Sequence, residues 1–264
     1  MKTSSLPTLF DLAGRAALLT GASGHLGSAF ADALAEAGAN VVCASRELDR
    51  AQASADRLAT ARGNCHFAVQ LDQTDDVSLN AGFDAAVAAA GQIDILVNNG
   101  HAGDAHDLTD VNEAEFNQVL ANATGYFLLA RRLRDHVVAR GASGSVVMIG
   151  SMYGVVGSYP DAYEDICPAS PVSYHTLKGG IIHQTRHLAV YWARDNVRVN
   201  CLSPGPFPSQ KAPARMVERL KKKSPMGRMG TPDELKGALL YLASDAGSYT
   251  TGQNLVVDGG WTAW

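Results

Sequence analysis

Tyr174 and Lys178 are the residues of this chain whose types and spacing are best suited to chemistry. Four positions apart, they leave the same face of any helix that contains them. A neighbouring ammonium favours a phenolate, so we expect Lys178 to lower the pKa of Tyr174 from its ordinary value of about 10. A tyrosine tuned in this way can give or take a proton near neutral pH. The pair alone is a weak signal, because the same spacing occurs by chance on many helix surfaces.

A glycine-rich turn lies near the start of the chain. Gly21, Gly24 and Gly27 follow a short apolar segment, 16–20, and lead into a helical segment, 28–37. Between a strand and a helix, such a turn lets backbone N–H groups approach a pyrophosphate, which also meets the positive end of the helix dipole. The context therefore predicts a dinucleotide-binding site rather than a simple tight turn.

The end of the next expected strand, 40–45, bears on which nicotinamide cofactor is bound. An acidic residue there accepts hydrogen bonds from the ribose hydroxyls of NAD. Here the residues are Ser45 and Arg46, so no carboxylate repels a 2′-phosphate and a guanidinium is present to bind it. Glu47 follows at once and can compete for Arg46. NADP(H) is therefore favoured over NAD(H).

Together with further residues in the same order, these motifs resemble the short-chain dehydrogenase/reductase family from about residue 9 to the C-terminus. The matching residues are Thr20, Gly21, Gly24, Gly27, Asp72, Asn98, Asn99, Gly100, Asn122, Ser151, Tyr174, Lys178, Pro204, Gly205, Asp258, Gly259 and Gly260. The resemblance implies hydride transfer between a nicotinamide cofactor and a carbon that bears an alcohol or ketone oxygen.

The resemblance also implies a role for each catalytic residue. Ser151 would donate a hydrogen bond to the substrate oxygen, and Tyr174 would be the general acid and base. Lys178 would tune Tyr174 and bind the nicotinamide ribose, and Asn122 would hold a proton-relay water. Taken alone, Ser151 at a strand end could be no more than part of a turn.

The resemblance further assigns cofactor contacts to Gly21, Ser23, Gly24, His25, Leu26, Gly27, Ser45, Arg46, Asp72, Gln73, Asn99, Gly100, Tyr174, Lys178, Pro204, Gly205 and Phe207. Asp72 could instead be only a turn or helix cap. Two positions depart from the family pattern. His25 stands where a glycine is commoner, and the segment from Asn98 to His101 replaces Asn-Asn-Ala-Gly. His101 could hydrogen-bond a substrate oxygen or merely fill a polar pocket wall.

The separation of Ser151 and Tyr174 is longer than is usual for the family. The excess, 155–172, predicts an inserted loop over the mouth of the active site, with Tyr153, Tyr159, Tyr163 and His101 as substrate contacts. Tyrosines and polar groups suit a hydroxylated ring. The insertion could instead be a packing or oligomer-contact loop. By resemblance, 206–224 would be a substrate-covering loop and helix whose closure excludes water.

Within the family, the chain looks most like oxidoreductases of the gluconate 5-dehydrogenase type or of surface-sugar (nonulosonate) modification. The function we expect is an NADP-dependent oxidoreductase that interconverts a secondary alcohol and a ketone on a sugar-like or sugar-acid substrate. The enzyme alternative is a 3-oxoacyl-carrier-protein reductase, which needs a basic patch at the cleft rim. The non-enzyme alternative is an NADP-binding regulatory protein, which the presence of Tyr174 and Lys178 disfavours.

Apolar runs alternate with helical patterns, which predicts one α/β domain at 9–264 behind a flexible tail at 1–8. Strands are expected at 16–20, 40–45, 65–71, 93–98, 145–149, 198–203 and 254–257, and helices at 28–37, 48–62, 77–90, 113–140, 173–195 and 232–243. Joined by right-handed crossovers, they would form a doubly wound (Rossmann) seven-stranded parallel sheet with helices on both faces.

Bulk composition narrows the partners. A formal charge of −4 and a pI of about 6.0 argue against a nucleic-acid partner. The four cysteines are scattered, and no early apolar run is long enough for a signal peptide or membrane span, so we expect a cytoplasmic protein. His183 and His187 lack the acidic neighbour of a metal motif, and no metal site is predicted. The family resemblance implies a small-molecule substrate and a homotetramer or homodimer.

Overall fold

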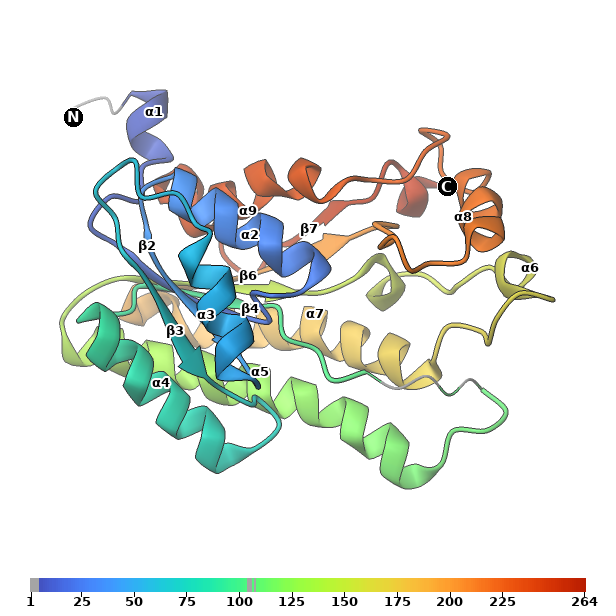
Figure 1. The fold of residues 1–264 in the computed structure, drawn as a ribbon, viewed down its shortest axis with the longest axis horizontal. Helices are drawn as coiled ribbons and strands as arrows, with labels where there is room; N and C mark the ends of the chain where they lie inside the picture. Colours follow the sequence, from blue (N-terminus) through green and yellow to red (C-terminus); the bar gives the residue numbers. More distant parts are fainter. Residues whose placement is uncertain (1–4, 104–105, 107) are drawn as a thin grey trace.

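The computed structural model describes residues 5–103, 106 and 108–264 and contains one seven-stranded parallel sheet (Figure 1). The strands are β1 (Ala16–Thr20), β2 (Asn40–Ser45), β3 (His66–Gln70), β4 (Ile95–Asn98), β5 (Gly144–Ile149), β6 (Val197–Pro204) and β7 (Asn254–Val257). They lie in the order β3-β2-β1-β4-β5-β6-β7. The order reverses between β1 and β4, where doubly wound sheets bind ligands. The predicted fold class is confirmed.

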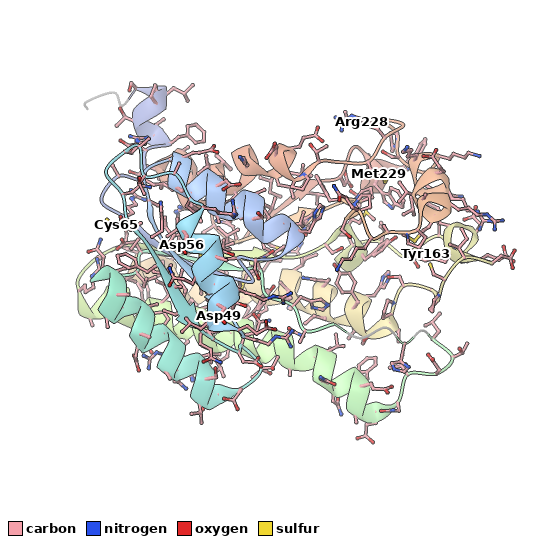
Figure 2. The ribbon with its side chains drawn as sticks, viewed as in Figure 1. Asp49, Asp56, Cys65, Tyr163, Arg228 and Met229 are labelled. Atoms are coloured by element: carbon pink, nitrogen blue, oxygen red, sulfur yellow. The ribbon has the colours of Figure 1, made fainter. Side chains whose placement is uncertain are left out.

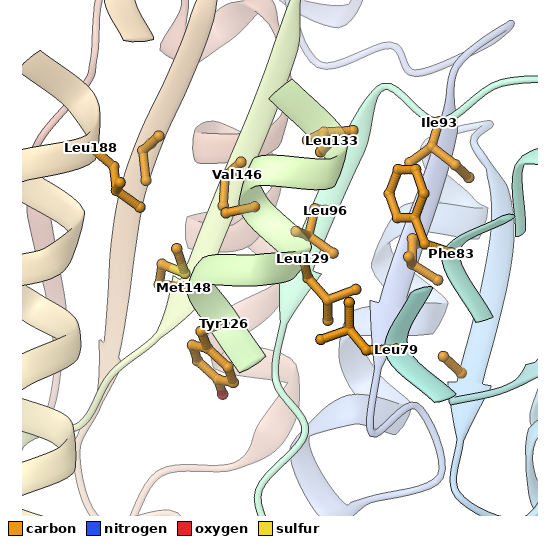
Figure 3. Close-up of a cluster of buried hydrophobic side chains, with 14 of the residues drawn as sticks. Leu79, Phe83, Ile93, Leu96, Tyr126, Leu129, Leu133, Val146, Met148 and Leu188 are labelled. Carbon is orange, nitrogen blue, oxygen red and sulfur yellow. The ribbon is translucent and has the colours of Figure 1, made fainter. Parts of the chain in front are cut away.

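Two layers of helices cover the sheet. One face carries α2 (His25–Glu36), α3 (Leu48–Asp56) and α9 (Lys236–Ala243), and the other carries α4 (Asp76–Ala90), α5 (Glu113–Ala139) and α7 (Val172–Trp192). Figure 3 shows the second face, where Leu129 and Leu133 of α5 pack against Leu96 and Val146 of the sheet. β1 and β5 are buried along their whole length, as their continuous apolar sequences require.

Local signals at the helix ends explain most of the boundaries. α5 starts with a capping box, in which the Asn112 side chain accepts from the Glu115 N–H and the Glu115 side chain accepts from the Asn112 N–H. α4 ends at Gly91, whose φ of 78° is the left-handed conformation that favours glycine. Such start and stop residues are the local signals from which these helix boundaries could be predicted.

The largest departure from the predicted boundaries lies in α3, and part of the predicted N-terminal tail is helical. The helix expected at 48–62 ends at Asp56, because the next arginine, Arg57, turns back to Asp32 and to the Ser28 carbonyl on α2. The tail expected at 1–8 includes α1 (Leu6–Leu9), which begins at a Ser5 cap; residues 1–4 lie outside the described residues. The α3 difference arises from a contact that a local pattern does not contain, whereas the Ser5 cap is a local signal.

The carboxyl ends of the strands meet at one edge of the sheet, and the segments over this edge build the candidate site. They include a 3-10 turn at Met152–Gly154, α6 (Pro160–Tyr163) and α8 (Ala214–Lys221). In Figure 2, Tyr163 and Met229 lie on the α8 side of the molecule, far from Cys65. No helix within the described residues is both long and apolar enough to cross a membrane.

Candidate functional site

Three adjoining cavities form one cleft over the carboxyl edge of the sheet. Their volumes are about 490, 240 and 350 Å³. The first follows the glycine-rich turn and the ends of β2 and β3, and the second contains Ser151, Tyr174 and Lys178. The third lies between the insertion and α8. His101 lines all three, so the cleft is continuous.

The glycine-rich turn leaves room where a phosphate would lie. A Cβ on Gly27 would stand 2.0 Å from the Gly21 carbonyl oxygen, so only glycine fits there. α2 begins at His25 behind Gly24, with no side-chain cap on its first N–H groups. Asn99 Nδ2 donates to the carbonyl oxygens of Thr20 and Gly21, 3.1 Å away in each case, which fixes the turn. An uncapped helix start beside a rigid glycine turn fits a pyrophosphate.

The end of β2 presents arginines to the cleft. Ser45, Arg46 and Arg50 line the first cavity, and Arg46 is exposed. Within the described part of the chain Arg46 forms no ion pair, whereas Glu47 lies 3.5 Å from Arg50 Nε. Glu47 therefore competes for Arg50 rather than Arg46. Arg50 was missed from the sequence, although its position one helical turn after Arg46 could have indicated it.

Asp72 and Gln73, at the end of β3, also line the first cavity. Asp72 Oδ1 accepts from the backbone N–H and the hydroxyl of Thr74, at 2.9 and 2.7 Å. Asp72 therefore caps a turn and still borders the cleft. The Gln73 side chain also donates to Asn122 Oδ1 on α5.

Ser151, Tyr174 and Lys178 converge where the second and third cavities join. Ser151 follows β5 in the chain, and its hydroxyl lies close enough to the Tyr174 phenol to act on the pKa of that phenol. The Lys178 ammonium lies 5.5 Å from the centre of the Tyr174 ring and donates to the Ile149 carbonyl oxygen at 2.7 Å. The i and i+4 positions of α7 thus share one face, as expected.

The expected direction of the Tyr174 pKa is wrong for this structure. Burial raises the pKa of Tyr174 above its ordinary value, and the nearby Ser151 hydroxyl offsets only part of this effect. A phenolate loses more hydration than a phenol in a closed site. Lys178 does not reverse the shift, because burial lowers its own pKa to about 8 and it therefore loses its charge before Tyr174 ionises. Tyr174 therefore stays protonated at neutral pH, as an acid needs to be.

Lys178 is 4% exposed, and this burial lowers its pKa to about 8. The ammonium, which would stabilise a phenolate left on Tyr174, is present below that pH and is lost above it. We therefore expect kcat/KM for ketone reduction to be level at lower pH and to fall as pH rises through about 8. Initial rates of NADPH oxidation across that pH value test this. A level profile well above it would contradict the assignment.

Asn122 is buried on α5 and is fully hydrogen-bonded to protein. Its Oδ1 accepts from the Ala102 N–H at 2.9 Å and from Gln73 Nε2 at 2.7 Å. Its Nδ2 donates to the carbonyl oxygens of Ala102, at 2.9 Å, and Val119, at 2.8 Å. The side chain thus holds the segment after β4 in place, and its polar atoms are already occupied by protein rather than free for the predicted water.

The third cavity is lined by His101, Val119, Ser151, Met152, Tyr153, Tyr163, Ser170, Pro171, Ser173, Tyr174, Gly205, Pro206, Phe207, Pro208, Ala212, Met216 and Leu220. The hydroxyls of Tyr153 and Tyr163 are hydrogen-bonded to each other at 2.8 Å, and the Tyr153 ring stacks on His175 with ring centres 4.6 Å apart. Tyr159, also predicted to contact substrate, does not line this cavity. It packs instead on Trp261 and the Lys223 ammonium.

The insertion and α8 are joined to each other above this cavity. Arg219 Nη1 donates to the carbonyl oxygens of Asp161 and Glu164, at 2.8 and 2.6 Å, and Lys223 pairs with the Asp161 carboxylate at 2.6 Å. Trp261 is buried beneath them. The insertion therefore both lines the third cavity and holds α8 in place.

His101 stands at the junction, with its ring edge-on to Tyr174 and 5.3 Å between centres. Burial, and to a smaller extent the nearby Lys178 ammonium, lowers the pKa of His101 to about 4. The imidazole is therefore neutral at physiological pH and can both donate and accept hydrogen bonds. A hydroxylated molecule in the third cavity would meet it beside Tyr174.

The chain resembles known oxidoreductases over nearly its whole length. Residues 21–262 match the family described as Enoyl-(Acyl carrier protein) reductase. A galactitol 2-dehydrogenase (L-tagatose-forming) from Cereibacter sphaeroides is 37% identical, over 97% of this chain and 98% of that protein.

Two solved structures agree with this chain in fold and length. One is a short-chain type dehydrogenase/reductase from Mycobacterium marinum, with 35% identity, a TM-score of 0.87, and coverage of 99% of this chain and 100% of that one. The other is a gluconate 5-dehydrogenase from Burkholderia cenocepacia in complex with NADP and tartrate, with 31% identity, a TM-score of 0.88, and coverage of 98% and 100%. With the converging serine, tyrosine and lysine, these matches establish that the chain belongs to the short-chain dehydrogenase/reductase family of oxidoreductases.

Proposed function

We propose that the protein is an NADP-dependent oxidoreductase that interconverts a secondary alcohol and a ketone on a sugar-like substrate. The observation that carries the proposal is the convergence of Ser151, Tyr174 and Lys178 where the long cofactor-shaped cavity meets the smaller one under α8. A binding protein without catalysis, the non-enzyme alternative, has no need for this buried lysine beside a tyrosine.

In the reduction direction, the substrate carbonyl oxygen lies between the hydroxyls of Ser151 and Tyr174. When bound, the nicotinamide supplies the hydride. Ser151 donates a hydrogen bond to the oxygen as it gains negative charge, and Tyr174 gives it a proton. Lys178 stabilises the resulting phenolate by charge. Asn122 and its bonds to Ala102 keep the cleft wall fixed during these steps.

The cofactor contacts follow the cleft from end to end. The turn at Gly21 to Gly27 and the start of α2 would hold the pyrophosphate, and Lys178 the nicotinamide ribose. Arg46 and Arg50 would bind a 2′-phosphate, which supports NADP(H) over NAD(H). The gluconate 5-dehydrogenase structure contains NADP, which agrees with this preference.

The relatives name both a polyol and a sugar acid as substrates, and the third cavity favours the uncharged class. Among its described lining residues none carries a formal charge at neutral pH, since His101 is neutral. Lys211, Arg215, Arg219 and Lys221 are next to lining residues in the chain but do not line the cavity themselves. A carboxylate taken into this cavity would lose hydration without gaining a partner.

A matched pair of ketones tests this preference. L-sorbose and 5-keto-D-gluconate differ only in a hydroxymethyl group against a carboxylate. We expect kcat/KM for NADPH-dependent reduction to be about 10-fold or more higher for L-sorbose, from the cost of an unpaired charge. Met216→Lys, which adds a cation to the lining, should narrow the ratio. Equal rates on both, or a preference for the acid, would contradict the uncharged class.

Acetoacetyl thioesters in the same assay test the enzyme alternative. A carrier-protein reductase needs a continuous patch of free basic residues at the rim. Here Lys221 pairs with Glu218 at 2.5 Å and Lys223 pairs with Asp161, which leaves Lys211, Arg215 and Lys222 without an ion pair among the described residues. Arg219 is bound to the insertion. We therefore expect turnover on sugars and little on thioesters, and the reverse result would favour the reductase.

We also propose a cytoplasmic homotetramer or homodimer, in keeping with the family resemblance. Apolar groups stay exposed on the outer faces of α5 and α7, where Val138 is 42%, Val190 78% and Tyr191 58% exposed. Such a surface suits a second copy of the chain. Of the C-terminal tryptophans, Trp261 is 1% exposed and packs within its own subunit, whereas Trp264 is 73% exposed.

A further inference from the structure

Gln73 joins three elements of the cleft through one buried amide. It follows β3 and is 8% exposed. Its Nε2 donates to Asn122 Oδ1 on α5 and to the Gly100 carbonyl oxygen after β4, each at 2.7 Å. One acceptor is the residue before His101, and the other, Asn122, is bonded to the residue after it. A glutamine side chain with two such bonds does more than border the cofactor cavity.

Backbone groups fix which way both amides point. Asn122 accepts from the Ala102 N–H and donates to the Ala102 and Val119 carbonyl oxygens, so its Oδ1 must face Gln73. The atom of Gln73 that meets it must then be the Nε2 donor. Gln73 Oε1 is left buried with no hydrogen-bond partner among the described residues. That arrangement is costly unless the two donated bonds compensate for it.

Gln73 also accounts for the glycine at position 100. A Cβ on Gly100 would lie 2.4 Å from Gln73 Oε1, so the amide would have to move. The alanine that the family pattern would place there therefore fits only if Gln73 gives up its present position and the bonds that hold it. The two residues depend on each other, because the amide needs the space that the glycine leaves.

The consequence reaches the catalytic tyrosine through His101. Gln73 holds Gly100, and Asn122, which Gln73 also binds, holds Ala102. His101 is thus fixed on both sides, and its ring lies 5.3 Å from the Tyr174 ring. We propose that Gln73 is a positioning residue, which acts through Asn122 and Gly100 to set His101 against Tyr174 at the junction of cofactor and substrate. This inference rests on the proposed function for its effect on rate.

The first test removes the donor and keeps the length of the side chain. Gln73→Met should lower kcat about 10- to 100-fold, since small displacements of catalytic groups cost this much. The Kd for NADPH, from fluorescence titration, should change less than about 3-fold, because the two bonds that Gln73 donates go to protein groups and not to the cofactor. Gln184→Met is the matched control, because Gln184 also donates to an α5 carbonyl, that of Ala123, but away from the cleft. It should keep kcat.

The second test is a double-mutant cycle that needs no substrate. Gly100→Ala should weaken NADPH binding and lower the melting temperature in the native background, and do so far less in Gln73→Val, which lacks the Oε1 atom. Residues in contact couple in this way, here by about 10-fold in Kd. Equal effects of Gly100→Ala in both backgrounds would overturn the inference, as would unchanged kcat in Gln73→Met. If the two substitutions are coupled but the protein reduces no ketone, the proposed function and the effect of Gln73 on rate are rejected. Only the contact between Gln73 and position 100 would then stand.

Discussion

Replacing Tyr174 by phenylalanine should lower kcat by about 1,000-fold or more while NADPH still binds. General acid catalysis by a positioned side chain contributes about 100- to 10,000-fold, and here the phenol lines both cavities that meet at the junction. The ring remains, so its packing against His101 and Lys178 is preserved. Steady-state rates with L-sorbose and fluorescence titration with NADPH measure the two effects separately.

Tyr241→Phe is the matched control for this change. It removes a hydroxyl that bonds Thr250 at 2.6 Å, remote from the cleft, and should leave kcat within about 2-fold, as is usual for substitutions outside a site. Ordinary turnover in Tyr174→Phe would remove the proposed mechanism. Loss of NADPH binding together with turnover would assign Tyr174 to cofactor binding instead.

Replacing Arg46 by alanine should weaken NADPH binding about 10- to 100-fold and leave NADH binding nearly unchanged. A hydrogen bond to a charged group contributes about 1.5–3 kcal/mol, and only NADPH carries the 2′-phosphate that would receive it. Arg50→Ala should act in the same direction but less strongly, because Arg50 is already shared with Glu47. Titration of each variant with both cofactors gives the comparison.

Two further variants define this result. Arg194→Ala removes an exposed arginine in the 3-10 turn that follows α7 and should alter neither Kd. Ser45→Asp places a carboxylate at the end of β2, where it would repel the 2′-phosphate and accept from ribose hydroxyls, so the preference should move toward NADH. Equal losses for NADPH and NADH in Arg46→Ala would contradict the 2′-phosphate assignment.

The sheet was largely predictable because its signals are local. β1, β2 and β7 begin and end where the sequence predicts, since each is a short apolar run between turn residues. α3 was predicted too long because its end depends on Arg57 reaching α2, a contact between residues 25 positions apart. Element type thus follows from periodicity, and some boundaries follow only from packing.

The cofactor side of the cleft was more predictable than the substrate side. Glycine turns and strand ends recur at fixed places in this fold, so Gly27 and Ser45 could be placed from spacing alone. Which side chains of the insertion reach the cavity depends on non-local packing. Tyr159 packs on Trp261, whereas Tyr163 lines the third cavity. The pKa of Tyr174 was mispredicted for a related reason, because desolvation depends on the whole enclosure and not on Lys178 alone.

Transfer of deuterium from NADPH that carries deuterium at both C4 positions of the nicotinamide is the most direct test of the central claim. We predict that the protein oxidises this cofactor in the presence of L-sorbose and that mass spectrometry finds one deuterium on carbon in the polyol product. We predict further that Tyr174→Phe, with the same cofactor bound, forms almost none. Bound NADPH with no deuterium in any product from L-sorbose, 5-keto-D-gluconate or an acetoacetyl thioester would contradict the proposed oxidoreductase.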